Sequence, residues 1–269
     1  QELLRLAASA DKPAYTVAHN GTLESIAALR PATLEDLAAI KGVVDSYNTS
    51  SDAKAKIKVQ AFPQDSYNDS VVSAAAAGKL PCIVDIDGPN VPNWAWAEYL
   101  TPLKLTTDLS AHLPSTVATW EGETYAVGHY DVALAMLARA SDLKAAGVRV
   151  ATVEQPWTKD ELQDALTKLK ALGKWDYPLD RGTAGSGEWL PYGYSPFLQS
   201  FGADLINRDG FQTAEGVLNG DKAVEWAQWF RGLAEQGFMA TKSGKDSTQD
   251  FLNTKSGLLY TGSWAADKA

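Results

Sequence analysis

The chain has 269 residues and a mass of 28.9 kDa, the length of one large domain or two small ones. Hydrophobic residues at 45% and charged residues at 21% are typical of a folded globular protein and exclude wholesale disorder. With 24 basic against 33 acidic residues, the formal charge is −9, so nucleic-acid binding would need a local basic patch.

The first third of the chain predicts alternating helices and extended segments. Residues 2–10 have helical spacing, and residues 14–18 are predicted to be extended. A short helix is expected to open at residues 22–25 and to stop before Pro31. Thr33 with Asp36 is a capping pair for a further helix that reaches Tyr47.

A β-α-β unit follows. Residues 57–62 alternate apolar and polar side chains, which predicts a half-buried strand, and residues 66–78 predict a helix. Residues 81–86 form a short apolar strand with both faces covered, so the sheet is expected to be parallel. Residues 87–90, Asp-Gly-Pro-Asn, break this strand at its carboxyl end, where ligands bind in open α/β sheets.

The same kind of pattern continues to the C-terminus. Residues 124–137 predict a further extended run, and a helix is expected to start at residues 159–161. Its apolar stripe is Leu162, Ala165, Leu166, Leu169 and Leu172. After it come a glycine-rich aromatic stretch, two helices and a final strand, at residues 182–194, 195–201, 221–236 and 257–261.

Most catalytic motifs are missing from the sequence. Its three histidines, His19, His112 and His129, lie far apart, and no HExxH, GxSxG, P-loop or GxGxxG pattern occurs. The single cysteine, Cys82, excludes an internal disulfide and predicts a small buried hydrophobe, so neither a metal nor a cofactor is expected. Asp85 and Asp87 keep a glycosidase open, because two carboxylates at i and i+2 share one face of a regular strand.

Tryptophan is the unusual component. The chain has nine, and none precedes residue 90. They are Trp94, Trp96, Trp120, Trp157, Trp175, Trp189, Trp226, Trp229 and Trp264. This distribution separates an aromatic-poor front from an aromatic-rich remainder.

From about residue 43, the order of the segments resembles the extracellular solute-binding proteins of ABC sugar importers, the maltose-binding-protein-like class. The similar segments are residues 44–48, 57–59, 65–69, 74–81, 85–96, 99–103, 187–189, 196–202, 214–220 and 262–264. The resemblance implies an α/β, two-lobed, periplasmic-binding-protein-like fold, incomplete at the C-terminus because family members are longer. Either the chain is a fragment, or another molecule, such as a second copy of the chain, covers the apolar surfaces that the missing part leaves exposed.

The resemblance also implies domains and a site. We expect an atypical, partly helical N-terminal segment at residues 1–42, a first lobe at 43–128 and a second lobe at 129–269 that ends at the return crossing. The expected sugar-binding residues are Asp87, Asn90, Trp94, Trp96, Asp131, Glu188, Trp189, Tyr192 and Trp264. Indoles can stack on the apolar face of a sugar ring, and carboxylates and amides can bind its hydroxyls.

Structural interpretations compete with these roles. Asp87 and Asn90 could only shape a turn, and one of Trp94 and Trp96 is expected in the core. Trp226 and Trp229, at i and i+3 on a helix, are expected in the core, and Trp157 is expected to staple the entry of a helix and not to bind ligand. Glu188 and Trp189 lie in a glycine-rich loop, where functional residues concentrate.

The front of the chain has a second resemblance. Residues 13–17, 22–27 and 30–43 are similar to part of the HRDC domain of helicases and RNase D, a nucleic-acid-binding accessory. Residues 1–42 carry four basic against five acidic side chains, a net charge of −1. This segment lacks the positive charge that attracts DNA phosphates, so nucleic-acid binding is not expected. Alternatively, residues 15–18 supply the first strand of the sugar-binding lobe and residues 34–47 its first helix.

The sequence therefore favours a non-enzymatic carbohydrate receptor that closes two lobes on a sugar and presents it to an ABC permease. The resemblance implies a periplasmic or extracellular location, with a lipid anchor in some relatives. No run reaches the roughly 18 apolar residues of a membrane helix, and we expect that any secretion leader was removed or never existed. The alternatives are a carbohydrate-active hydrolase using Asp85 and Asp87 or Glu188, and a structural chimera that binds nothing.

Overall fold

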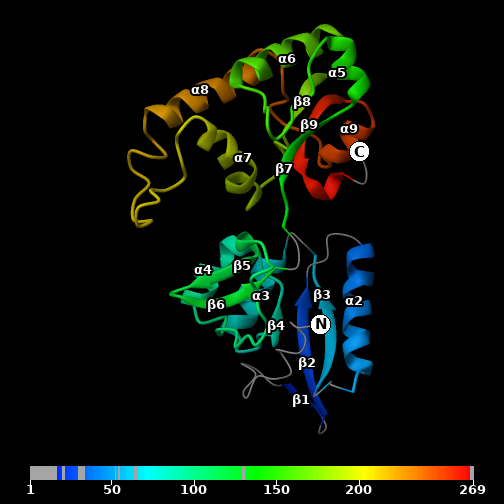
Figure 1. The fold of residues 1–269 in the computed structure, drawn as a ribbon, viewed down its shortest axis with the longest axis vertical. Coiled ribbons are helices and arrows are strands. Elements are labelled where there is room, and N and C mark those ends of the chain that lie inside the picture. Colours follow the sequence, from blue (N-terminus) through cyan, green and yellow to red (C-terminus); the bar gives the residue numbers. More distant parts are fainter. Residues whose placement is uncertain are drawn as a thin grey trace. The chain divides into compact units, whose positions relative to one another are not determined.

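The computed structural model of the chain (Figure 1) describes residues 17–19, 22–29, 34–51, 53, 55–63, 66–128 and 131–266. Its contacts divide the chain into two compact units, with the boundary between Asp131 and Val132. No helix in these ranges is long and apolar enough to cross a bilayer. The expected helix at residues 2–10 lies outside them.

The first unit is built on a four-stranded sheet. Its strands are β1 (Val17–His19), β2 (Thr22–Leu29), β3 (Lys56–Ala61) and β4 (Ile83–Val84). Strand β2 pairs antiparallel with β1 and parallel with both β3 and β4. Helices α2 (Leu34–Thr49) and α3 (Tyr67–Ala76) connect the parallel strands in turn. The predicted parallel β-α-β unit is confirmed.

The predicted helix opening at residues 22–25 is wrong, because these residues begin strand β2. The backbone of β2 pairs with β3 from Glu24 to Leu29 and with β4 at Ala27 and Ala28. Hydrogen bonding to two strands outweighs a weak local helix signal. The helix predicted to reach Tyr47 forms as α2, and the first strand of the parallel core is β2 rather than residues 15–18.

The rest of the first unit contains short helices and a hairpin. Its helical pieces are η2 (Gly88–Asn90), α4 (Val91–Trp96) and η3 (Pro114–Thr116). Strands β5 (Val117–Trp120) and β6 (Glu123–Val127) pair antiparallel. The two residues between them, Glu121 and Gly122, both have positive φ, as a type I′ turn requires. The predicted run at 124–137 is therefore divided between β6 and a later strand.

The second unit is a three-stranded sheet with helices packed around it. Its elements are β7 (Leu134–Ala138), α5 (Ala140–Ala146), α6 (Lys159–Ala171), β8 (Tyr177–Asp180), α7 (Trp189–Ser200), α8 (Asp221–Glu235), α9 (Ser247–Leu252), β9 (Ser256–Gly262) and η4 (Ser263–Ala265). Strand β9 is central, antiparallel to β7 and parallel to β8, and it is buried at every residue. The unit's main core includes Leu166, Leu179, Leu233 and Leu258.

Helix α6 follows its sequence signals, whereas α7 does not. In α6, the predicted residues Leu162, Ala165, Leu166 and Leu169 are all buried. The helix predicted at residues 195–201 starts earlier, at Trp189. Gly193 and Pro196 disfavour a helix locally, but aromatic packing of α7 against α8 and β9 stabilises it.

Candidate functional site

Three of the expected binding residues meet in the second unit. Trp189 and Tyr192 lie one turn apart on α7, with ring centroids 6.1 Å apart. Tyr192 also contacts Trp264 of η4, at 6.4 Å with the two ring planes 31° apart. The side chains of Tyr192 and Trp264 are 38% and 48% exposed, and Trp189 is half-buried. We call these three rings the aromatic platform.

Glycines make room for the platform. A Cβ on Gly185 would clash with the indole of Trp189, and a Cβ on Gly193 would lie 2.7 Å from its Cε2. A Cβ on Gly262 would clash in the same way with the ring of Trp264. The glycine-rich sequence thus lets two indoles lie directly on backbone, which fixes where their rings are presented.

Buried aromatic residues pack against the platform. Tyr260 of β9 lies 6.4 Å from Trp189 and 4.9 Å from Phe197, ring centroid to ring centroid. The Nε1 of Trp189 and the hydroxyl of Tyr260 are buried, and neither has a hydrogen-bond partner among the described residues. Burial raises the pKa of Tyr260 to about 12, so its hydroxyl stays protonated and can donate.

A carboxylate directly precedes the platform. Glu188 is exposed and stands immediately before Trp189 at the start of α7, without capping that helix through its side chain. The platform therefore combines exposed aromatic faces with an acidic group next to them in the chain. Apolar faces with a nearby hydrogen-bond acceptor can bind a ligand that has both C–H faces and hydroxyls.

Four other expected residues lie in one segment of the first unit. Asp87 and Asn90 are half-buried after β4, and the backbone N–H of Asn90 donates to the carbonyl of Asp87 at 2.9 Å. Trp94 is 3% exposed and packs with Tyr67, whereas Trp96 is 73% exposed. Residues two apart point to different sides of a helix, so α4 buries one tryptophan and exposes the other. One core tryptophan is expected, and it is Trp94, although a helical segment favours Trp94 as the exposed member of the pair.

The last expected residue, Asp131, ends the first unit. Its side chain is exposed and accepts a hydrogen bond from the hydroxyl of Ser115 at 2.7 Å. The structure therefore groups Trp189, Tyr192 and Trp264, and separately places Asp131 beside Ser115.

The remaining tryptophans with structural interpretations pack against other rings or brace the entry to a helix. Trp226 stacks on Phe230 at 5.5 Å, and Trp229 stacks on Phe197 at 5.8 Å, so α8 uses both indoles to hold other rings. The Nε1 of Trp157 donates to the carbonyl of Arg149 at 3.2 Å, at the entry to α6. These contacts agree with the expected supporting roles.

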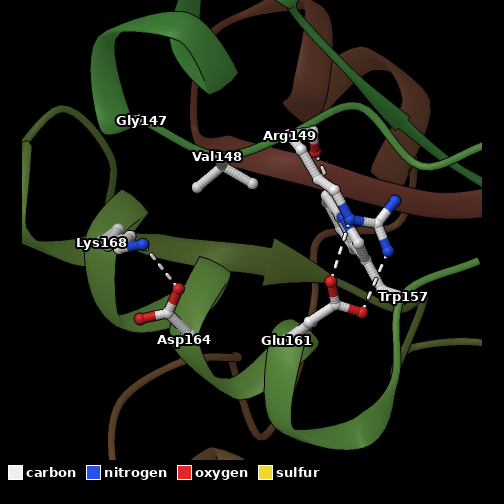
Figure 2. A pocket seen from close by; sticks show the side chains of 7 residues that line it. All are labelled: Gly147, Val148, Arg149, Trp157, Glu161, Asp164 and Lys168. Carbon is white, nitrogen blue, oxygen red and sulfur yellow. Dashed lines mark hydrogen bonds and ion pairs between the residues drawn. The ribbon is translucent and has the colours of Figure 1, made fainter.

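Trp157 also lines a surface pocket with Arg149, Glu161, Asp164 and Lys168 (Figure 2). Arg149 donates to both carboxylate oxygens of Glu161, at 2.9 and 3.0 Å. Lys168 pairs with Asp164 at 2.7 Å. The pocket's charged side chains thus satisfy one another, so it makes a weaker candidate site than the platform.

Sequence reasoning missed Tyr260, which contacts Trp189, and Arg181, whose guanidinium lies over the ring of Tyr260. Tyr260 lies in a largely apolar strand, where a tyrosine is typical of a sheet core and does not by itself indicate a site. Arg181 directly follows β8 and opens the glycine-rich loop, and an arginine at the carboxyl end of a strand was the available signal. Within the described residues, no group of three His, Cys, Asp or Glu side chains could hold a metal ion.

Comparison with known proteins defines the class of fold first. The chain matches the GacH receptor of Streptomyces glaucescens GLA.O with a TM-score of 0.74 and 21% identity, over 91% of this chain and 61% of that one. It matches the substrate-binding protein Lmo0181 of Listeria monocytogenes with a TM-score of 0.75 and 17% identity, over 91% and 62%. The fold is that of the two-lobed periplasmic binding proteins, and the chain spans less than two thirds of each match.

The family follows from the sequence model that matches residues 42–269, described as bacterial extracellular solute-binding protein. The chain belongs to this family. An uncharacterised lipoprotein of Streptomyces antibioticus, encoded in the 5′ region of oleD, is 26% identical over 152 residues, which are 52% of this chain and 32% of that protein.

A second model, the HRDC domain, matches residues 4–47. The described part of this match includes β1 and β2, and β2 is hydrogen-bonded to β3 in the first unit's sheet. This pairing supports the interpretation that the front of the chain supplies structure to the lobe.

Proposed function

We propose that this chain is the sugar-binding receptor of an ABC importer and that it holds a sugar ring on the aromatic platform. The observation that carries the proposal is the platform itself: Tyr192 and Trp264 are partly exposed, and glycines leave room for the indoles of Trp189 and Trp264. Among the structural matches, GacH is described with acarbose, Lmo0181 with cycloalternan and a Staphylococcus aureus solute-binding protein with maltose. These ligands are all carbohydrates.

The chemistry of the platform suits such a ligand. The C–H face of a sugar ring stacks on an indole, and its hydroxyls donate to a carboxylate such as Glu188. Of the residues in the first unit, Asp87, Asn90, Trp96 and Asp131 are proposed as further polar or stacking contacts. Trp94, which packs in the core, is proposed to act by holding α4 in place.

We propose no catalytic step for this chain. The receptor would act by binding, by closing its lobes on the sugar and by delivering it to a membrane permease, in a periplasmic or extracellular location. The family is extracellular, and the relative from Streptomyces antibioticus is described as a lipoprotein.

Tryptophan fluorescence, titrated with maltose, tagatose and a chitin oligosaccharide, tests the proposal. A saturable change with at least one sugar is expected. Calorimetry with that sugar should then show that Trp189→Ala or Trp264→Ala weakens affinity about ten-fold, or ~1.4 kcal/mol, because a stacked ring is lost. Trp157→Ala is the control and should bind as the unchanged chain does, since Trp157 belongs to the separate pocket.

Two results would contradict the proposal. A flat response to every sugar would favour a fold that binds no carbohydrate. Release of nitrophenol from nitrophenyl glycosides, abolished by Glu188→Gln, would instead favour a hydrolase.

A further inference from the structure

Arg181 is a buried cation surrounded by aromatic rings. The residue follows β8 directly and is 1% exposed. Its guanidinium carbon lies 4.0 Å from the ring centroid of Phe197 and 4.9, 5.0 and 5.3 Å from those of Tyr194, Phe230 and Tyr260. These four rings come from α7, α8 and β9.

The hydrogen bonding of this guanidinium is incomplete. Its Nη2 donates to the carbonyl of Gly193 at 3.2 Å, whereas Nε and Nη1 have no partner among the described residues. None of the described carboxylates forms an ion pair with it. The adjacent Asp180 does not pair with it: its Oδ1 accepts from the backbone N–H of Gly182 and from the hydroxyls of Ser243 and Ser247, and its Oδ2 is buried without a partner among the described residues.

Such an arrangement is costly for stability. Burial lowers the pKa of Arg181 to about 10, so the side chain is still charged at neutral pH. A buried charge without a counter-charge loses its hydration, and cation–π contacts with four rings restore only part of that loss. An apolar side chain of similar length would leave no donor unsatisfied there, so Arg181 is not explained by stability.

Its contacts connect it to both elements that carry the platform. The carbonyl that Arg181 binds belongs to Gly193, and the indole of Trp189 rests on the α-carbon of the same glycine. On the other side, Arg181 contacts Tyr260 of β9, and β9 runs directly into η4 with Trp264. A planar guanidinium has fixed donor directions and stacks face to face with rings, so it restricts how α7 can rotate against β9.

We propose that Arg181 is a positioning residue that sets the orientation of the aromatic platform, at a cost in stability. This inference rests on the proposed function, because orientation of the rings matters for binding only if a ligand stacks on them. It assigns Arg181 no contact with the ligand.

The test compares Arg181→Met and Arg181→Lys with the unchanged chain. Methionine fills the site without charge or donors, and lysine keeps the charge but loses the planar fork. The control is Arg231→Met, which removes an exposed arginine that pairs with Glu235 on α8. Each variant is measured by urea unfolding, by near-ultraviolet circular dichroism of its aromatic side chains, and by calorimetry with maltose.

We expect Arg181→Met to unfold at the same or a higher urea concentration than the unchanged chain. Its aromatic dichroism should nevertheless change, and its maltose affinity should fall about five- to ten-fold. Arg181→Lys should show the same two losses, and Arg231→Met neither.

Three results would overturn the inference. Unaltered dichroism and affinity in Arg181→Met would show that the rings hold their orientation without the guanidinium. Loss of folding in that variant would make Arg181 a stabilising residue. Full affinity and dichroism in Arg181→Lys would show that charge alone is enough. If the unchanged chain does not bind maltose, the dichroism still tests the orientation, whereas the sugar panel tests the proposed function.

Discussion

Single glycines decide where the platform rings lie. Gly185 has no positive φ, so its backbone could accept alanine, but the added Cβ would clash with the indole of Trp189. We predict that Gly185→Ala displaces the indole and weakens sugar affinity about ten-fold, an effect of ~1.4 kcal/mol. Calorimetry with a sugar that the unchanged chain binds measures this loss directly.

Gly42→Ala is the matched control for this substitution. Gly42 lies in α2, has open space around its α-carbon and has no positive φ. Alanine should therefore stabilise the helix by roughly 0.5–1 kcal/mol and leave binding unchanged. If Gly185→Ala bound sugar as tightly as Gly42→Ala, the lack of a side chain at Gly185 would have no role in placing Trp189.

Residues of the site differ in how far the sequence could predict them. The family resemblance indicates Glu188 and Trp189, and their place in a glycine-rich stretch supports them because such loops concentrate function. Arg181 and Tyr260 were not found, because their roles arise only when β8, α7 and β9 pack together. Local sequence marks the exposed part of a site better than the buried part that supports it.

The start of α6 shows how an element can be specified by its own termini. Thr158 accepts from the backbone N–H of Glu161, and the Glu161 side chain accepts from the backbone N–H of Thr158, so the two form a capping box. Glu161 also binds the guanidinium of Arg149 (Figure 2). The hydrogen bond from Arg149, followed by the one from the Thr158 backbone, lowers the pKa of Glu161 from 4.5 to about 2.

A pH-dependent stability follows from this pKa. A carboxyl whose pKa is lowered by folding stabilises the folded state when ionised, so its contribution is present above pH 4.5 and is lost as the pH falls towards 2. We predict that Glu161→Gln lowers stability at pH 7 and removes this part of the loss between pH 4.5 and 2. Urea unfolding at a series of pH values measures both effects.

The control here is Thr158→Ala, which removes the cap but keeps the pair of Glu161 with Arg149. It should cost about 1 kcal/mol at neutral pH and retain a pH dependence between pH 4.5 and 2. Equal pH profiles for Glu161→Gln and the unchanged chain would exclude Glu161 as the titrating group.

Elements were predictable where local signals and tertiary contacts agree. Helix α6 has a cap, an apolar stripe and a buried face, and its predicted start and stripe were confirmed. Strand β2 has no comparable pattern, because its identity depends on pairing with β3 and β4, which follow later in the chain. A position between two parallel partners is not encoded within the strand's own residues.

At the scale of the whole molecule, the two units have separate hydrophobic cores. One cluster of the first unit is Tyr67, Val71, Leu80 and Trp94, whereas the main core of the second includes Leu166 and Leu258. The described clusters each stay within one unit. Because a core belongs to one cooperative folding unit, we expect the chain to unfold in two calorimetric transitions.

Core truncations test this expectation. Leu166 is fully buried in α6 and Leu80 is 6% exposed in the first unit, so alanine at either position leaves a cavity. We predict that Leu166→Ala lowers the temperature of one transition and Leu80→Ala that of the other. In each case the free energy of unfolding of the affected unit should fall by about 2–5 kcal/mol. Differential scanning calorimetry of the two variants and the unchanged chain assigns the transitions. If either substitution shifted both transitions equally, the two units would unfold as one cooperative unit. Ligand binding at the platform would then stabilise both units rather than the second alone.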